Sequence, residues 1–285
     1  MTSTSPRTWL ITGGSRGLGR AFAEVALDAG DAVVVTARKV KQLDDLMEAH
    51  PGRALALPLD VTDRGAVASV VQNALALTGR IDVLVNNAGY GLAGAVEEVS
   101  EQQARDQFEV NVFGALWCTQ AVLPAMRAQG SGHIFQVSSI GGVAAFLNTG
   151  IYHASKWALE GMSESLAQEV ASFGIGVTIV EPGAFRTDFN GDSMVRATPM
   201  AAYDEVLRDR REAHSGAYAR TQPGDPHRAG QALLRVLESA SPPRRLLLGS
   251  AAAELGPATY RQRLDVWAEW DHVARAADFP EEQTT

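Results

Sequence analysis

The residues best suited to acid–base chemistry are a tyrosine and a lysine four positions apart, Tyr152 and Lys156. On a helix this spacing places both side chains on one face. A free phenol has a pKa of about 10, which is too high for efficient proton transfer at neutral pH, and a nearby ammonium lowers that pKa. The pair therefore predicts a tyrosine that exchanges a proton with a substrate oxygen and a lysine that activates it. The plainer alternative is a half-buried tyrosine beside a surface lysine.

A glycine-rich segment near the N-terminus, Thr12 to Gly19, reads Thr-Gly-Gly-Ser-Arg-Gly-Leu-Gly and lies between an expected strand and an expected helix. Such a turn lets a pyrophosphate approach the amides at the helix N-terminus. The same segment contains Gly-x-Ser-x-Gly, the pattern of a serine hydrolase with Ser15 as nucleophile. That interpretation is disfavoured because no earlier strand is available to build an oxyanion hole. A phosphate-binding loop of the Gly-Lys-Ser/Thr type is excluded by Arg20.

The elements that position these residues alternate between short apolar runs and helical patterns. The apolar runs predict buried parallel strands, and Ser100 with Gln103 forms a capping-box pattern at the start of the longest helix. The expected strands are 9–11, 32–35, 54–57, 81–85, 133–137 and 177–180, and the expected helices are 17–29, 40–49, 63–78, 100–128 and 152–173. This alternation predicts an α/β fold with a doubly wound parallel sheet of the Rossmann type.

The pattern changes after Pro182. Residues 183–223 are polar and mixed, which is typical of a lid over a binding site. A helix over 226–239, an apolar run over 246–248 and a helix over 254–276 follow. We expect residues 1–285 to form a single Rossmann-type domain with this lid and a C-terminal helical extension.

Composition narrows the class of protein further. The chain has 285 residues with a net charge of −8, so no basic face is available for nucleic acid. Cys118 is the single cysteine and the histidines lack metal-binding spacing, so neither a disulfide nor a metal site is expected. No apolar run is long enough to span a membrane, and the first residues lack the apolar stretch of a signal peptide. We therefore expect a cytoplasmic protein with no membrane partner.

The order of the motifs resembles the short-chain dehydrogenase/reductase family over about residues 8–190. The glycine spacing is Gly-x-x-x-Gly-x-Gly rather than Gly-x-Gly-x-x-Gly, and Tyr152 follows Ser139 by thirteen residues. The other matching segments are Asn86-Asn-Ala-Gly89 after the fourth strand, Asn111 within the long helix, Tyr152-x-x-x-Lys156, Pro182-Gly183 and Thr187.

The resemblance implies a role for each matching residue. Tyr152 is the proton donor, Ser139 holds the substrate oxygen, and Asn111 anchors a water of the proton relay. The implied cofactor contacts are Gly13, Ser15, Arg16, Gly17, Leu18, Gly19, Arg38, Asp60, Val61, Asn87, Ala88, Gly89, Tyr152, Lys156, Pro182, Gly183 and Thr187. Among these, Asp60 contacts the adenine, Lys156 the ribose hydroxyls and Thr187 the carboxamide. Asp60 has an alternative role as a cap of the helix that starts near Asp63, and Ser138 is expected to pack within its strand.

Two arginines predict which dinucleotide is used. Folds that prefer NAD carry an acidic residue at the end of the second strand, whereas this chain reads Val35-Thr-Ala-Arg38 there. Arg38, with Arg16 in the glycine loop, suits a 2′-phosphate, so the predicted cofactor is NADP (NADPH). The alternative is two ordinary surface arginines.

We expect the substrate to be a small-molecule carbonyl or alcohol, most simply an apolar ketone or aldehyde reduced by NADPH. It would lie between Tyr90–Gly94, Gly141–Asn148 and the lid, which offer the side chains Tyr90, Phe146, Phe185, Phe189 and Met194. The rival functions are a catalytically inactive dinucleotide-binding regulator and the serine hydrolase that uses Ser15. The resemblance also implies a homodimer or homotetramer, although Trp267 and Trp270 could instead pack within the subunit.

Overall fold

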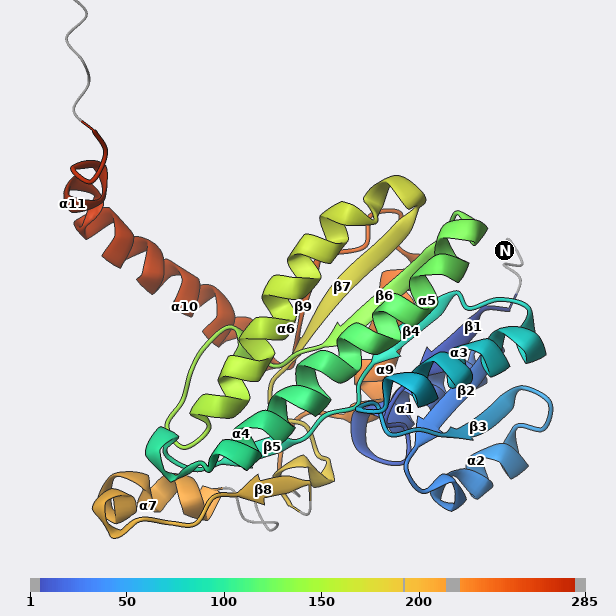
Figure 1. Ribbon diagram of the computed structural model, residues 1–285, viewed down its shortest axis with the longest axis horizontal. Helices are drawn as coiled ribbons and strands as arrows, with labels where there is room; N and C mark the ends of the chain where they lie inside the picture. Colours follow the sequence, from blue (N-terminus) through green and yellow to red (C-terminus); the bar gives the residue numbers. More distant parts are fainter. Residues whose placement is uncertain (1–5, 192, 214–220, 280–285) are drawn as a thin grey trace, which may run out of the picture.

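A central sheet of seven parallel strands organises the protein, in the order β3-β2-β1-β4-β6-β7-β9 (Figure 1). This computed structural model describes residues 6–191, 193–213 and 221–279. The strands are β1 (Thr8–Ile11), β2 (Ala32–Ala37), β3 (Ala54–Pro58), β4 (Val83–Asn86), β6 (Gly132–Val137), β7 (Ile175–Pro182) and β9 (Arg245–Leu248). The strand order reverses direction between β1 and β4, which is where folds of this type bind their ligands. The predicted doubly wound α/β fold is confirmed.

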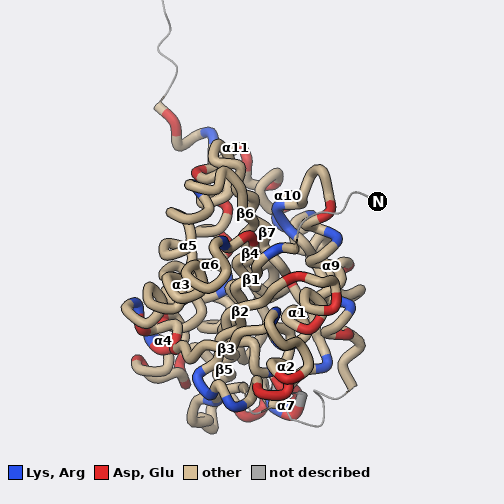
Figure 2. Tube along the Cα trace, turned by 90° about the vertical axis from the view of Figure 1, so that its right-hand side faces the viewer, with Lys and Arg blue, Asp and Glu red and all other residues tan. Residues whose placement is uncertain are grey.

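The strands form where apolar residues face both sides of the sheet. β1, β2 and β4 contain no charged residue, and Figure 2 shows charged residues along outer elements such as α2 (Asp44–Ala49) and α7 (Asp204–Ala213). The expected strand positions are correct, with shifted ends. β2 continues to Ala37, and β4 starts at Val83 rather than at residue 81. Arg38 therefore follows directly on the end of β2.

Two layers of helices cover the sheet. α1 (Gly17–Asp28), α2 and α9 (Pro226–Glu238) bury Phe22, Leu46 and Leu233 against one face. α3 (Arg64–Thr78), α5 (Ala115–Gln129) and α6 (Gly150–Glu169) bury side chains such as Val71 and Val122 against the other. The expected helix over 40–49 is a 3₁₀ turn, η1 (Val40–Leu43), followed by α2.

The long helix expected over 100–128 is divided by a π-helical turn. α4 (Glu101–Phe108) begins with the predicted capping box, in which the Gln103 amide donates to Ser100 Oγ at 3.2 Å and the Ser100 amide donates to Gln103 Oε1 at 3.1 Å. The π-helix η3 (Glu109–Gly114) then leads into α5. Single π-helical turns of this kind are often found at functional sites, and this one contains Asn111.

The segment expected to be a lid contains structure that the sequence pattern did not predict. β8 (Met194–Arg196) pairs in parallel with β5 (Gly91–Ala93), a second short strand that was also missed. Farther along, Arg211 of α7 forms an ion pair with buried Glu98 at 2.5 Å. Residues 192 and 214–220 of the segment lie outside the described residues. Both the lid role and the single domain stay predictions.

The remaining short elements are 3₁₀ turns, namely η2 (Val96–Glu98), η4 (Ile140–Gly142), η5 (Ala171–Phe173), η6 (Asp188–Asn190) and η7 (Ala201–Tyr203). They connect the main elements around the sheet. η4 is the one that bears on chemistry, because it follows directly on Ser139.

The C-terminal helix starts earlier than expected and runs away from the sheet (Figure 1). It consists of α10 (Ser250–Glu269) and α11 (Asp271–Arg275). Ala252 and Gly256 are buried near the start, whereas Trp267 is 65% exposed and Trp270 is 58% exposed. The alternative that these tryptophans pack within the subunit is therefore wrong. None of the described helices is long and apolar enough to cross a membrane.

Candidate active site

Tyr152, Lys156, Ser139 and Asn111 meet beside the carboxyl ends of β4 and β6. Ser139 is the second residue after the end of β6. Tyr152 and Lys156 lie in the first two turns of α6. The Ser139 hydroxyl lies near the Tyr152 phenol. Lys156 Nζ donates to the carbonyl of Val137 at 2.8 Å and lies 5.9 Å from the centre of the Tyr152 ring. The predicted spacing has therefore brought the two side chains to one face of one helix.

Burial controls the protonation of this pair. Burial raises the pKa of Tyr152 to about 12, and the nearby Ser139 hydroxyl opposes that rise. Burial also lowers the pKa of Lys156 to about 8, although the negative charge of Glu160 acts to raise it. The Lys156 ammonium is directed at the Val137 carbonyl, and desolvation of the phenolate dominates in the protein alone. The activation of Tyr152 by Lys156 stays a prediction.

Asn111 occupies the π-helical turn and is 1% exposed. Its Oδ1 accepts from the Tyr90 amide at 3.1 Å, and its Nδ2 donates to the Tyr90 carbonyl and to Ser155 Oγ, both at 3.1 Å. A Cβ on Gly89 would lie 3.0 Å from Asn111 Oδ1 and 3.7 Å from Lys156 Nζ. Asn111 is thus a buried, fully oriented amide between the loop after β4 and the helix that carries Lys156.

The glycine loop is held against the end of β4. Asn87 Nδ2 donates to the carbonyls of Thr12 and Gly13, both at 3.0 Å. Gly13 has a φ of +66°, and a Cβ there would stand 2.8 Å from Ala88 Cα. At Gly19 a Cβ would stand 2.3 Å from Asn87 Nδ2. Only glycine permits this contact, which brings the predicted residues Asn87 and Ala88 against the loop.

The N-terminus of α1 fits the pyrophosphate of a dinucleotide. Its N-cap residue, Arg16, makes no side-chain capping bond, so the first amides of the helix remain available to an anion. A Cβ on Gly17 would lie 3.6 Å from Thr187 Cβ, which places the predicted carboxamide ligand beside the same loop. Arg16 and Arg38 are exposed and form no ion pair with any residue of the described ranges. The free amides of α1 are donors of the kind that the pyrophosphate of a nicotinamide dinucleotide requires.

Three residues near the adenine and ribose sides have roles that the sequence left open. Asp63, and not Asp60, caps α3, since its side chain accepts from the Ala66 amide at 2.9 Å. Asp60 accepts instead from the amide and hydroxyl of Thr62, and it is exposed. The capping alternative for Asp60 is therefore wrong. Val61 is buried, and a Cβ on Gly114 would lie 2.6 Å from its side chain.

The segments expected around the substrate adjoin one another. β5 and β8 join the loop after β4 to the lid segment, and a bridge between Gly94 and Thr149 joins it to the loop before α6. Phe189 lies against the Tyr152 ring, with 5.7 Å between centres. Phe185 is placed elsewhere, in a cavity of about 580 Å³ that it shares with Arg228 and Leu248.

His153 is a residue of this site that sequence reasoning missed. It is 4% exposed, its Nδ1 accepts from the Phe146 amide at 3.3 Å, and its Nε2 lies 3.2 Å from Thr149 Oγ1. Burial lowers its pKa to about 4, so the ring is neutral at neutral pH and holds the loop beside Tyr152. Its position next to Tyr152 in the sequence was the signal available for it.

No hydrogen bond joins Ser15 to a histidine within the described part of the chain, so the arrangement of a serine hydrolase is not seen there. The same residues contain no group of three or more histidine, cysteine and acidic side chains that could hold a metal ion. The polar groups that do converge are those around Tyr152.

Comparison with known proteins identifies the family. The sequence profile described as short chain dehydrogenase matches residues 7–196. The chain belongs to the short-chain dehydrogenase/reductase family of oxidoreductases, as the motif order implied. Similar proteins of known structure include an alcohol dehydrogenase from Thermococcus sibiricus complexed with 5-hydroxy-NADP and a metagenomic short-chain oxidoreductase in complex with NADP.

The similarity to individual proteins extends over most of the chain. It is 44% identical to oxidoreductase BOA17 of Botryotinia fuckeliana, over 87% of this chain and 90% of that protein. It is 36% identical to 3-ketodihydrosphingosine reductase of Bacteroides thetaiotaomicron, over 86% of this chain and 88% of that one. A short-chain dehydrogenase structure from Streptomyces avermitilis superposes with a TM-score of 0.91, at 45% identity over 96% of this chain and all of that one.

The buried, neutral state of His153 predicts a loss of stability in acid. An unfolded histidine has a pKa of about 6.5, so between pH 6.5 and 4 the unfolded chain binds a proton that the folded chain does not. Stability from this residue is present above that window and lost as pH falls through it. Replacing His153→Gln should reduce the fall in unfolding free energy between pH 7 and 4.5 by about 2 kcal/mol.

Urea unfolding of the protein without ligands measures this difference. A His272→Gln variant on exposed α11 is the matched control and should lose as much stability in acid as the wild type. If His153→Gln and His272→Gln behave alike, His153 does not contribute to the acid response.

Proposed function

We propose that this protein is an NADPH-dependent reductase of an apolar ketone or aldehyde. The observation that carries the proposal is the convergence of Ser139, Tyr152 and Lys156, in which the Ser139 hydroxyl lies near the Tyr152 phenol and the Val137 carbonyl holds the buried Lys156 ammonium. This arrangement offers a carbonyl oxygen two hydroxyl donors at one point. The membership of the chain in an oxidoreductase family supports the same chemistry.

The roles of the side chains follow from their contacts. The Tyr152 hydroxyl gives its proton to the carbonyl oxygen as that oxygen gains negative charge. The Ser139 hydroxyl donates to the same oxygen and orients it. Lys156 supplies a buried positive charge that stabilises the phenolate left behind. Asn111, held by the Tyr90 backbone and Ser155, fixes the helix turn opposite Lys156 and anchors the water that returns the proton.

NADPH supplies the hydride when it is bound, and this chain offers a defined set of residues to hold it. The amides at the start of α1 and the loop from Gly13 to Gly19 bind the pyrophosphate. Thr187, beside Gly17, binds the carboxamide, and Arg38 with Arg16 binds the 2′-phosphate. A hydrogen bond to a charged group contributes roughly 1.5–3 kcal/mol, which is about a ten- to hundredfold effect on affinity.

The substrate class is proposed from the side chains beside Tyr152. Phe189 contacts the Tyr152 ring, and Met194 and Phe189 both lie against Gly91, where a Cβ would be 2.7 Å and 3.1 Å from them. Phe146 stands edge-on to His153. Apolar and aromatic side chains around a polar centre suit an apolar carbonyl compound. A relative named for a ketone on a long apolar chain, the 3-ketodihydrosphingosine reductase, supports this class.

An inactive dinucleotide-binding regulator remains the alternative, and loss of the phenol hydroxyl discriminates the two. We expect Tyr152→Phe to lose at least a hundredfold in kcat while NADPH binding, followed by fluorescence titration, stays within a few-fold, because general acid catalysis typically contributes 10²–10⁴-fold. Lys156→Arg should also lose most of the wild-type kcat, since a planar guanidinium does not replace a compact ammonium in a buried site.

The assay is NADPH oxidation with a panel of apolar ketones and aldehydes. Tyr260→Phe, on the outer part of α10, is the matched control and should keep full activity. A Tyr152→Phe enzyme that retained more than about a tenth of wild-type kcat would remove Tyr152 from its role. A wild type that binds NADPH but reduces nothing in the panel would favour the regulator.

The proposed choice of NADPH over NADH rests on Arg38 at the end of β2. Arg38→Asp replaces an attraction for the 2′-phosphate with a repulsion, and its carboxylate accepts from the ribose hydroxyls of NADH. The ratio of kcat/KM for NADPH to that for NADH should therefore fall at least tenfold and can invert. Arg235→Asp on α9 is the control for a general loss of positive charge. An unchanged ratio in Arg38→Asp, or a wild type that prefers NADH, would contradict the proposal.

We also propose that the protein is a homo-oligomer in which α10 contacts a second copy. Every residue from Leu264 to Phe279 is exposed, and apolar side chains gather there, namely Leu264, Val266, Trp267, Trp270 and Val273. A helix this apolar is normally covered by another surface. The segment carries more acidic than basic residues, which disfavours an anionic membrane surface as its partner. A cytoplasmic location, expected from the sequence, is part of this proposal.

Light scattering after gel filtration tests the proposed contact. The wild type should have the mass of a dimer or tetramer, and Trp267→Glu combined with Trp270→Glu should reduce it, because the two carboxylates cannot be buried without partners. Gln262→Glu, on the same helix, should leave the mass unchanged. A monomeric wild type, or a double variant of unchanged mass, would show that α10 does not hold the copies together.

A further inference from the structure

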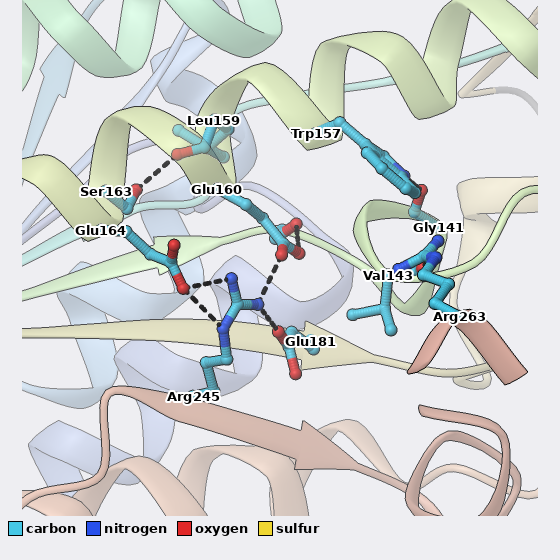
Figure 3. Close-up of polar contacts among 11 residues, drawn as sticks. Gly141, Val143, Trp157, Leu159, Glu160, Ser163, Glu164, Glu181, Arg245 and Arg263 are labelled. Atoms are coloured by element: carbon cyan, nitrogen blue, oxygen red, sulfur yellow. Dashed lines mark hydrogen bonds and ion pairs between the residues drawn. The ribbon is translucent and has the colours of Figure 1, made fainter. Parts of the chain in front are cut away.

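Behind the proposed active site lies a cluster of charged side chains that the mechanism does not use (Figure 3). Arg245 of β9 contacts three carboxylates, from Glu160 and Glu164 of α6 and from Glu181 of β7. Its Nη1 lies 2.5 Å from Glu160 Oε2 and also contacts Glu181, and its Nη2 lies 2.7 Å from Glu164 Oε1. The Glu160 and Glu181 side chains are only 5% and 2% exposed.

Glu160 connects this cluster to the catalytic residues. Its Oε1 accepts from Ser138 Oγ at 2.7 Å, and Ser138 is the residue before Ser139. A Cβ on Gly142 would lie 2.1 Å from the same oxygen, so Glu160 packs directly beneath the turn that follows Ser139. The expectation that Ser138 merely packs within its strand is therefore wrong. On α6, Glu160 lies one helical turn beyond Lys156, on the same face.

The charges in the cluster do not balance by themselves. Three carboxylates face one guanidinium. The groups around Glu160 come from three strand ends and from its own helix. They are Ser138, Glu181 and Arg245 from the strands, and Lys156 and Glu164 from α6. Burial, and then the charge of Glu160, raise the pKa of Glu181 to about 7. The charge of Glu160 also acts on Lys156, where it favours the ammonium against desolvation.

A buried ion cluster is weak evidence for stability, because the cost of desolvation can exceed the attraction between the charges. The location of this ion cluster indicates a role other than stability. Arg245 is tied to β7 through the β7–β9 pairing, in which Glu181 lies opposite Leu247. The guanidinium therefore anchors α6 to the last residues of β7 through Glu181, which precedes the final residue of that strand.

We propose that Glu160, anchored by Arg245, is a positioning residue of the active site. It fixes Ser138, and so Ser139, at the end of β6, and it supplies the buried negative charge that keeps the Lys156 side chain an ammonium beside Tyr152. The catalytic role of Glu160 rests on the proposed function. Its effect on the charge of Lys156 does not, and can be measured in the protein without ligands.

A lysine titration followed by NMR tests it without cofactor or substrate. The chain has three lysines, so Lys39→Arg with Lys41→Arg leaves Lys156 as the single signal of ¹³C-lysine-labelled full-length protein. Glu160→Gln keeps the shape and removes the charge, and should move the Lys156 midpoint down by about one pH unit. Glu160→Asp keeps the charge but withdraws it by one methylene, and should move the midpoint down by about half as much.

Glu164→Gln is the matched control, since it contacts the same guanidinium but lies two turns from Lys156 and has a half-exposed side chain. It should shift the midpoint by less than a quarter of the Glu160→Gln effect. The inference is overturned if the midpoint in Glu160→Gln equals the wild-type value, or if Glu164→Gln shifts it equally. It is also overturned if the Lys156 midpoint moves down as far in Glu160→Asp as it does in Glu160→Gln. Should Glu160→Gln not fold, a Glu160→Asp midpoint equal to that of the wild type overturns the inference in its place.

With a ketone that the enzyme reduces, the alkaline limb of the kcat profile in Glu160→Gln should move down by the same amount as the NMR midpoint. A shifted midpoint in a protein that reduces no carbonyl would refute the proposed function and leave the positioning role intact. If the enzyme is active but Glu160→Gln moves neither the Lys156 midpoint nor the alkaline limb, the positioning role is refuted and the proposed function stands.

Discussion

The burial of one ammonium group constrains much of this structure. Lys156 is 6% exposed, and a buried charge is tolerated only where hydrogen bonds and opposite charge compensate for lost water. The Val137 carbonyl provides the hydrogen bond, so β6 must end beside the second turn of α6. Glu160 provides the opposite charge, and it in turn requires Arg245 from the last strand of the sheet. The positions of β6, α6 and β9 are thus linked through one side chain.

The loop after β4 meets the same centre from the other side. Asn111 reaches the Tyr90 backbone and Ser155 because a π-helical turn interrupts the long helix. A regular α-helix would carry the amide past this position, since each residue advances the helix by a fixed rotation. Asn87 then joins the same loop to the glycine segment. The glycine segment and Asn111 are therefore both hydrogen-bonded to the loop that follows β4.

The reactivity of the proposed catalytic pair depends on what is bound beside it. In the protein alone, desolvation dominates both groups, raising the pKa of Tyr152 and lowering that of Lys156. A phenol with a high pKa is a poor base but holds its proton until a developing oxyanion draws it off. A protonated phenol is the form from which the proposed reductase activity starts.

The sequence by itself determined the features that depend on local pattern. Alternating apolar runs and helical periods predicted the parallel sheet, and the spacing of Ser139, Tyr152 and Lys156 placed a chemical centre at one end of one helix. The shared face of Tyr152 and Lys156 follows from helix geometry alone, so no tertiary information was needed to expect it.

Only the tertiary structure decided what depends on contacts between distant segments. The pairing of β5 with β8 joins three-residue strands separated by about a hundred residues, and no local pattern marks them. The protonation of His153 and of Tyr152 is governed by burial, which a sequence does not state. Arg245 is an ordinary arginine in the chain, and its role exists because β7 and β9 bring it under Glu160 and Glu181. Spacing along one helix is a local property, whereas desolvation and charge pairing depend on which elements the fold packs together.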